Sequence, residues 1–295
     1  MFEGVISALV TPFRDDQVDS EALTRLIEYQ IRGGVNGIVP CGTTGESATL
    51  THDEHRQVIQ LVVEQVAGRV PVIAGTGSNS TKESIELTRF AQKIGATGAL
   101  LITPYYNKPT QEGLYLHYRS VAEAVELPIV LYNVPGRTAV DMKAETVARL
   151  AKVKNITAIK EATGDMERAS RIRLLTGDGI TLISGDDSTF LPFLAVGGRG
   201  AISVTANIAP ERMSALWRAW ERGDPKTARQ EHESLLELNR LLFCETNPIP
   251  IKAAVNWMGM CGPEIRPPLT PLAHPEGEAL RQAMVDLQLL SGAGD

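Results

Sequence analysis

The 295-residue chain has little of several residue types, and each scarcity excludes a class of protein. It holds three cysteines and five histidines, and aromatic residues make up 5% of it. Lysine and arginine (29) are outnumbered by aspartate and glutamate (35), so the net charge is −6. Nucleic acids and anionic membranes bind to basic faces, so neither is expected as a partner. The absence of low-complexity runs, with 43% hydrophobic residues, excludes a disordered chain and a coiled coil.

The cysteines also indicate a compartment. Cys41, Cys244 and Cys261 are odd in number, far apart in sequence and without CxxC spacing. We expect reduced thiols in a cytoplasmic protein rather than a disulfide framework. The first apolar run follows Glu3, lacks a basic flank and ends at Pro12, so it predicts neither a signal peptide nor a membrane span.

A short apolar run, a polar turn and a segment of helical period recur along the chain. The runs are too continuous for half-exposed strands and are typical of parallel strands covered on both faces. Capping boxes at Thr51-x-x-Glu54 and Ser80-x-x-Glu83 mark two of the helix starts between them. The eight predicted strands are 5–10, 36–39, 70–74, 98–102, 128–132, 156–159, 180–183 and 201–204.

Eight strands alternating with helices favour an α/β fold, a (β/α)8 TIM barrel, over an open doubly wound sheet. After the eighth strand only helical patterns follow, around 209–222, 227–243, 250–258 and 276–290. We therefore predict a catalytic barrel over 1–223 and a C-terminal helical domain over 224–295.

Reacting groups of such barrels lie at the carboxyl ends of the strands. Lys160 directly follows the apolar run 156–159, where an ammonium is poorly solvated and a neutral amine is favoured. A neutral amine is the nucleophile that forms a Schiff base with a ketone. A structural lysine that extends into solvent or pairs with Glu161 is the alternative. Lys252 is the one rival nucleophile and lies in the helical tail.

Other polar residues also follow strands. Tyr132 ends the fifth strand, beside the sixth, and a phenol there can move protons. The 42–45 turn (GTTG) can hold a small carboxylate with backbone N–H groups and hydroxyls, and Arg137 can clamp a second one. No nucleotide motif is present, and the spacing of His52 and His55 does not match a metal site, so no metal is expected.

Six motifs occur in order along the chain: GTTGES (42–47), TPYYN (103–107), YNVPGRT (132–138), IKEATG (159–164), SGDD (184–187) and AISVTAN (201–207). Together with NPIPIK (247–252), they resemble the dihydrodipicolinate synthase family over essentially the whole chain. The resemblance implies that pyruvate condenses with L-aspartate 4-semialdehyde through a Schiff base on Lys160, as in class I aldolases, with no cofactor beyond that imine.

The resemblance also implies residue roles. Tyr132 would donate and accept protons, linked through Thr44 to Tyr106, which in the family enters from a neighbouring subunit. The pyruvate pocket and the site for the semialdehyde carboxylate would use the matching family positions: Thr43, Thr44, Gly185 and Ile202 for pyruvate, and Arg137 for the semialdehyde. The family habit of a dimer of dimers implies a homotetramer.

Lysine-inhibited members of the family bind L-lysine at a dimer interface. The matching positions here carry residue types suited to an amino acid, with Glu83 complementary to an ammonium. They are Ser47, Ala48, His52, His55, Asn79, Glu83 and Tyr105. For Glu83 the alternative is helix capping, and for the two histidines it is a solvated helix start.

Two alternative functions remain open from the sequence. A sister pyruvate aldolase, such as N-acetylneuraminate lyase or a 2-keto-3-deoxy sugar-acid aldolase, would share the lysine and the tyrosine. Arg137 and the second threonine of the 42–45 turn suit a short acidic aldehyde better than a polyol. A non-catalytic barrel that senses pyruvate or lysine would not need this set of reactive groups.

Overall fold

The computed structural model describes residues 2–290, and the chain divides into two compact units. The first unit comprises the chain up to residue 4 together with residues 71–202. The second comprises residues 5–70 and the chain from residue 203 onward. No helix within residues 2–290 has both the length and the apolar character needed to cross a bilayer.

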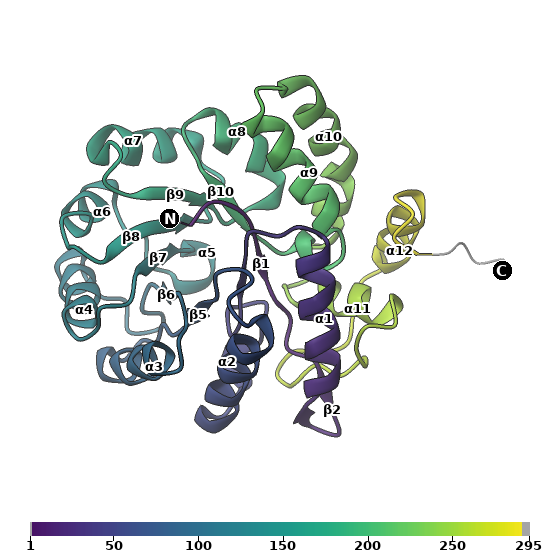
Figure 1. Ribbon diagram of the computed structural model, residues 1–295, viewed down its shortest axis with the longest axis horizontal. Coiled ribbons are helices and arrows are strands. Elements are labelled where there is room, and N and C mark those ends of the chain that lie inside the picture. The colour runs from purple at the N-terminus through teal and green to yellow at the C-terminus, as the bar shows by residue number, and fades with distance from the viewer. Residues whose placement is uncertain (1, 291–295) are drawn as a thin grey trace. The chain divides into compact units, whose positions relative to one another are not determined.

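The first unit alternates strands and helices along its whole length. Figure 1 shows β5 to β9 beside one another with α3, α4, α6 and α7 around them, and the ladder order is β10-β9-β8-β7-β6-β5. The elements are β5 (Ile73–Gly75), α3 (Thr81–Lys93), β6 (Gly98–Ile102), α4 (Gln111–Glu123), β7 (Ile129–Asn133), α5 (Pro135–Thr138), α6 (Ala144–Leu150), β8 (Ile156–Glu161), α7 (Met166–Thr176), β9 (Thr181–Ser184), the 3-10 turn η2 (Asp187–Thr189), α8 (Phe190–Ala195) and β10 (Gly200–Ser203).

The second unit holds the first part of the alternating pattern and the helical tail. Its elements are β1 (Gly4–Ala8), β2 (Phe13–Arg14), β3 (Gln17–Val18), α1 (Ser20–Arg32), β4 (Gly37–Val39), η1 (Ser47–Thr49), α2 (His52–Val66), η3 (Thr205–Asn207), α9 (Pro210–Glu221), α10 (Pro225–Leu241), α11 (Ile249–Trp257) and α12 (Gly277–Asp286). Within it, β1 pairs in parallel with β4.

Within residues 2–290, all eight predicted strands are present and alternate with helices in the order of a (β/α)8 barrel, which confirms the predicted fold class. The β2–β3 hairpin and the one-turn helix α5 were not predicted, because each is too short to carry a periodic pattern. Four predicted strands also extend further at their carboxyl ends than expected: β5 includes Gly75, β7 includes Asn133, β8 includes Lys160 and Glu161, and β9 includes Ser184.

The strands are buried because their sequences are apolar on both faces. All five residues of β7 are buried, as parallel strands covered by helices require. The helix starts follow local chemistry: Thr51 and Glu54 form the predicted capping box of α2. At α3 one half of the predicted capping box is indirect. The Ser80 N–H donates to the Ser78 hydroxyl instead of to Glu83, and the Ser78 hydroxyl in turn donates to Glu83.

Arg266 joins the helical tail to the start of α2. Its guanidinium donates to both oxygens of Glu54, at 2.8 and 2.6 Å. These hydrogen bonds are the main reason that the pKa of Glu54 falls from 4.5 to about 2. A carboxyl with a lowered pKa in the folded state stabilises the fold above its ordinary pKa, and this stabilisation is lost as the pH falls toward 2.

We therefore predict that Arg266→Met makes the free energy of unfolding less dependent on pH between 5 and 2. Urea unfolding at several pH values in this window measures the slope for wild type and variant. Arg56→Met, which removes an exposed ion pair with Asp53 on the same helix, is the control and should keep the wild-type slope. Equal slopes for Arg266→Met and wild type would contradict the prediction.

Candidate active site

Two buried polar side chains meet at the ends of β7 and β8. Tyr132 and Lys160 are partners in the parallel ladder, and each is 6% exposed. The Lys160 nitrogen lies 4.3 Å from the centroid of the Tyr132 ring. The interpretation of Lys160 as a lysine that extends into solvent is therefore wrong. The structure instead places an amine and a phenol in contact.

An irregularity in the ladder creates this contact. Ile129 pairs with Ile156, but the next residue, Val130, pairs with Ala158, so β8 carries one extra residue at that point. Because successive strand residues point to opposite faces, a shift of one residue changes which side chain stands opposite a given partner. With regular pairing from Ile129 onward, Tyr132 would face Ile159 instead of Lys160.

Glu161 lies on the other face of β8 from Lys160, because adjacent strand residues alternate. Its carboxylate, 2% exposed, accepts hydrogen bonds from Arg168 Nε at 2.7 Å and from the amide of Asn133 at 3.2 Å. Asp141 binds both Asn133 and Arg168, each at 3.0 Å. The predicted alternative of a Lys160–Glu161 pair is therefore wrong.

Asn133, Asp141, Glu161 and Arg168 form a second polar cluster that was not predicted from the sequence. The feature of the sequence that could have indicated this cluster is Glu161, a carboxylate immediately after Lys160 at the end of an apolar strand. A buried carboxylate needs a cation or several donors, so Glu161 demanded a partner other than its neighbour in sequence. Arg168, in α7, is that partner and is spaced seven residues away.

Gly185 leaves the space that the Lys160 side chain occupies. A Cβ built on Gly185 would come within 2.9 Å of Lys160 Cε and 2.6 Å of the Ala162 side chain. Ile202, 1% exposed, follows Ala201, which pairs with Ser184 of β9. Both residues were predicted to line the pyruvate pocket.

Arg137 and Tyr106 are both exposed in this chain. Arg137 sits in α5, which the Thr138 hydroxyl anchors: its oxygen lies 3.3 and 3.0 Å from the Val134 and Val140 carbonyl oxygens, which share its one proton. Thr103, at the end of β6, donates to Thr138 at 3.2 Å. Tyr106 is 90% exposed and adopts a left-handed φ of 69°. An aromatic ring this exposed has almost no packing contact within its own chain.

The second unit carries Thr43 and Thr44 in the predicted tight turn. Gly45 N–H donates to the Gly42 carbonyl and Glu46 N–H to that of Thr43, each at 3.1 Å. Thr44 is 3% exposed. The rival nucleophile Lys252 is 2% exposed and forms an ion pair with Glu46, so its nitrogen is committed to a carboxylate. Burial lowers the pKa of Lys252 more than Glu46 raises it.

The residues predicted for an L-lysine site divide between the units. In the first unit, the Asn79 carbonyl accepts from Asn107 at 2.8 Å, and burial, then the nearby Glu83 charge, raises the pKa of Tyr105. In the second unit, Ser47 and Ala48 form η1, and His52 and His55 lie in the first turn of α2. His52 is exposed, whereas His55 is buried.

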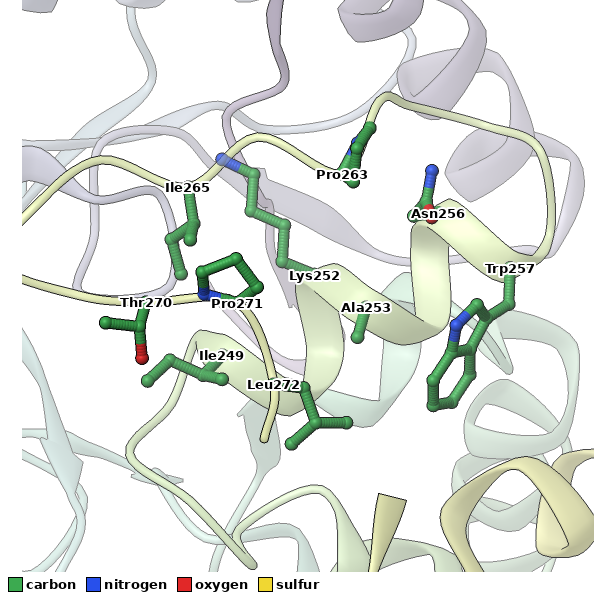
Figure 2. Close-up of a pocket in the computed structure, with 10 residues that line it drawn as sticks. All are labelled: Ile249, Lys252, Ala253, Asn256, Trp257, Pro263, Ile265, Thr270, Pro271 and Leu272. Carbon is green, nitrogen blue, oxygen red and sulfur yellow. The ribbon is translucent and has the colours of Figure 1, made fainter. Parts of the chain in front are cut away.

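A cavity of about 170 Å³ lies in the helical tail, within the second unit (Figure 2). It is lined mainly by apolar side chains of α11 and of the segment up to Leu272. The stem of Lys252 borders it, and Figure 2 shows the nitrogen at the far end from Ile249 and Leu272. None of the predicted site residues appears among its lining residues.

Three potential metal ligands approach one another in the same tail. Cys244, His274 and Glu276 place one donor atom each within 4.8 Å of the others, the one such group found within residues 2–290. This group was not predicted, because Cys244 lies 30 residues before His274 and shares no motif with it or with Glu276. Glu276 already accepts from Arg240 at 2.7 Å, and His274 Nδ1 accepts from Glu276 N–H at 3.1 Å.

Comparison with known proteins identifies related chains. A family model described as the dihydrodipicolinate synthetase family matches residues 1–287. A 4-hydroxy-tetrahydrodipicolinate synthase of Magnetococcus marinus is 61% identical, covering 98% of this chain and 99% of the relative. A solved structure of the chloride-inhibited dihydrodipicolinate synthase of Acinetobacter baumannii, complexed with pyruvate, is 48% identical with a TM-score of 0.96 and covers 98% and 100% of the two chains. The lysine-bound enzyme of Cyanidioschyzon merolae is 42% identical with a TM-score of 0.95 and covers 98% and 99%.

The contact between Gly185 and Lys160 generates a stability prediction. Gly185→Ala should lower the free energy of unfolding by about 1–3 kcal/mol, because the added methyl group overpacks the site. Gly136→Ala is the matched control: a Cβ there meets nothing within 4 Å, so stability should stay within about 0.5 kcal/mol of wild type. Urea unfolding measures both variants, and equal stabilities would show that the site has room for the methyl group.

Proposed function

The chain belongs to the dihydrodipicolinate synthetase family, and we propose that Lys160 is the residue on which its reaction is built. The protein is a lyase that condenses pyruvate with L-aspartate 4-semialdehyde to 4-hydroxy-tetrahydrodipicolinate, in lysine and diaminopimelate biosynthesis. The relatives carry this name and not that of a sugar-acid aldolase or a sensor. The observation that supports Lys160 is its buried nitrogen, 4.3 Å from the centre of the Tyr132 ring.

In the proposed reaction, the Lys160 amine attacks the keto carbon of pyruvate and water leaves to give an imine. Loss of a proton from the pyruvate methyl group converts the imine into an enamine. The enamine carbon adds to the aldehyde of the semialdehyde, and cyclisation releases the product with the free lysine. The cationic imine serves as the electron sink, so we propose that the reaction uses no other cofactor.

Proton transfers accompany each of these steps, and Tyr132 is the proposed acid and base. We propose that Thr44 links Tyr132 to Tyr106 of a neighbouring subunit. The 90% exposure of Tyr106 supports this role, because a tyrosine that serves a partner's site must project from its own chain. The active enzyme is accordingly proposed to be a homotetramer built as a dimer of dimers.

Two carboxylates need separate sites. Thr43 and Thr44 are proposed to hold the pyruvate carboxylate, with Gly185 and Ile202 lining the pocket. Arg137, on the short helix α5, is proposed to bind the semialdehyde carboxylate in a bidentate manner. We further propose a cytoplasmic location and retain, as a prediction, the division into a barrel over 1–223 and a helical domain over 224–295.

We also propose L-lysine as an inhibitor that binds to this protein. The likeness to the lysine-bound enzyme of Cyanidioschyzon merolae supports the proposal. So does the proximity of the Glu83 carboxylate to Tyr105, because a carboxylate and a phenol suit an amino-acid ligand. The proposed contacts are Ser47, Ala48, His52, His55, Asn79, Glu83 and Tyr105.

Borohydride reduction tests the Schiff base. With pyruvate present, reduction should add one pyruvate-derived mass to the peptide that contains Lys160, as read by mass spectrometry. Lys160→Arg should retain the fold, lose the adduct and lose nearly all activity, because a guanidinium stays protonated and cannot form the imine. Lys154→Ala, at an exposed lysine six residues earlier, is the control and should keep the adduct. An adduct on any other lysine would overturn the assignment.

Titration with L-lysine tests the regulatory site. Lysine should reduce activity and raise the melting temperature, since a ligand that binds the native state at 100 times its Kd stabilises it by about 2.7 kcal/mol. Glu83→Gln should abolish both effects, whereas Glu86→Gln, on the exposed face of the same helix, should preserve them. The proposal fails if lysine changes neither quantity in the wild-type protein.

A further inference from the structure

The turn that carries Thr44 is fastened to the helical tail of its own unit at several points. The carboxylate of Glu46, at the end of the turn, forms an ion pair with Lys252 of α11. Its other oxygen accepts the backbone N–H of Arg266 at 3.1 Å. Both side chains of the ion pair are 2% exposed or less. The tail and the turn are therefore fixed relative to each other by directional contacts shielded from water.

The surroundings of this ion pair are equally confined. The Lys252 nitrogen lies 4.1 Å from the centroid of the Phe13 ring, and the Arg266 guanidinium carbon lies 4.3 Å from it. Glu46 itself adopts a left-handed backbone, with φ of 54°. A residue with a side chain holds this conformation only where its neighbours impose it. These contacts with Lys252 and Arg266 of the helical tail therefore hold the turn in its position.

Asn247 lies two residues before the start of α11 and contacts the turn at Thr44. The amide nitrogen of Asn247 donates to the Thr44 hydroxyl oxygen at 3.0 Å, and the two residues are 5% and 3% exposed. A hydroxyl has one proton and two lone pairs. Because Asn247 donates to one lone pair, the Thr44 proton must point in another direction. The hydrogen bond therefore excludes Asn247 as the acceptor and leaves the Thr44 proton free to be donated to another group.

We propose that Asn247 is a positioning residue for the condensation, which orients the Thr44 hydroxyl as a hydrogen-bond donor. The inference rests on the role proposed above for Thr44 in proton transfer and carboxylate binding. Asn247 touches neither substrate in this proposal and acts through Thr44 alone. The helical tail thus contributes to the reaction by directing one proton.

Asn247→Asp tests the direction of this hydrogen bond with little change of volume. A carboxylate accepts where the amide donates, so the Thr44 proton would turn toward it. We expect kcat to fall by about tenfold or more, since positioned proton transfer contributes about a hundredfold or more to rates, and the pH profile of kcat to shift. Asn256→Asp, which removes an amide donor from α11 to the Cys261 carbonyl, is the matched control and should keep kcat within about twofold.

A double-mutant cycle separates positioning from a structural role. If Asn247 acts through Thr44, Asn247→Asp should have no further effect on kcat in a Thr44→Val background, whereas independent structural damage would multiply the two losses. Multiplied losses, or an unchanged kcat for the single variant, would overturn the inference. Where Asn247→Asp does not fold, Asn247→Ser removes the amide donor and enters the same cycle.

The borohydride reaction keeps this inference distinct from the proposed function. Wild-type protein that forms no pyruvate adduct on Lys160 contradicts the Schiff base itself. A wild-type adduct combined with wild-type kcat in Asn247→Asp contradicts only the role of Asn247. An adduct retained in Asn247→Asp, with kcat reduced, supports both.

Discussion

The pairing register of β7 and β8 determines which side chains can meet at the carboxyl end of these strands. One extra residue in β8 moves the pairing between Ile129 and Val130 by one position, and from there Tyr132 stands beside Lys160. The period of a strand is two, so the extra residue also decides which residues of β8 share a face with a given residue of β7. The meeting of amine and phenol thus depends on backbone pairing several residues before either side chain.

The same alternation separates two charged groups that are adjacent in sequence. Lys160 projects toward Tyr132 and the space left by Gly185, whereas Glu161 projects to the other face. There, Arg168 and Asn133 supply the donors that a buried carboxylate requires. Because Arg168 balances the charge of Glu161, the carboxylate is not available to neutralise the neighbouring amine. Two consecutive residues can therefore perform unrelated tasks, one in the proposed reaction and one in holding α7 to the sheet.

Local patterns in the sequence were sufficient to predict the strands, most helices and the fold class. Continuous apolar runs and capping residues such as Thr51 act over a few residues, so the sequence displays them directly. Lys160, Tyr132 and the 42–45 turn could be found because polar residues interrupt apolar runs. The ladder shift in β8, the partner of Glu161 and the contact of Asn247 with Thr44 could not be found. Each depends on segments brought together by the fold, as with Asn247 and Thr44, which are 203 residues apart.

The buried Glu46–Lys252 pair shows why a polar contact can be retained where an apolar one would be as stable. Removing two charges from water costs several kcal/mol per ion, and replacing such a pair by packed hydrophobic residues is often neutral or stabilising. Stability alone therefore does not account for it. Hydrophobic contact has no direction, whereas the Glu46 carboxylate fixes one oxygen on an ammonium and the other on the Arg266 N–H. Two directional contacts on one side chain hold the left-handed backbone of Glu46, and through it the turn, in a single orientation. In the proposed role, Thr44 must present its proton in one direction, and this requires a turn held in a single orientation. An apolar pair of the same volume would not hold the turn in this way.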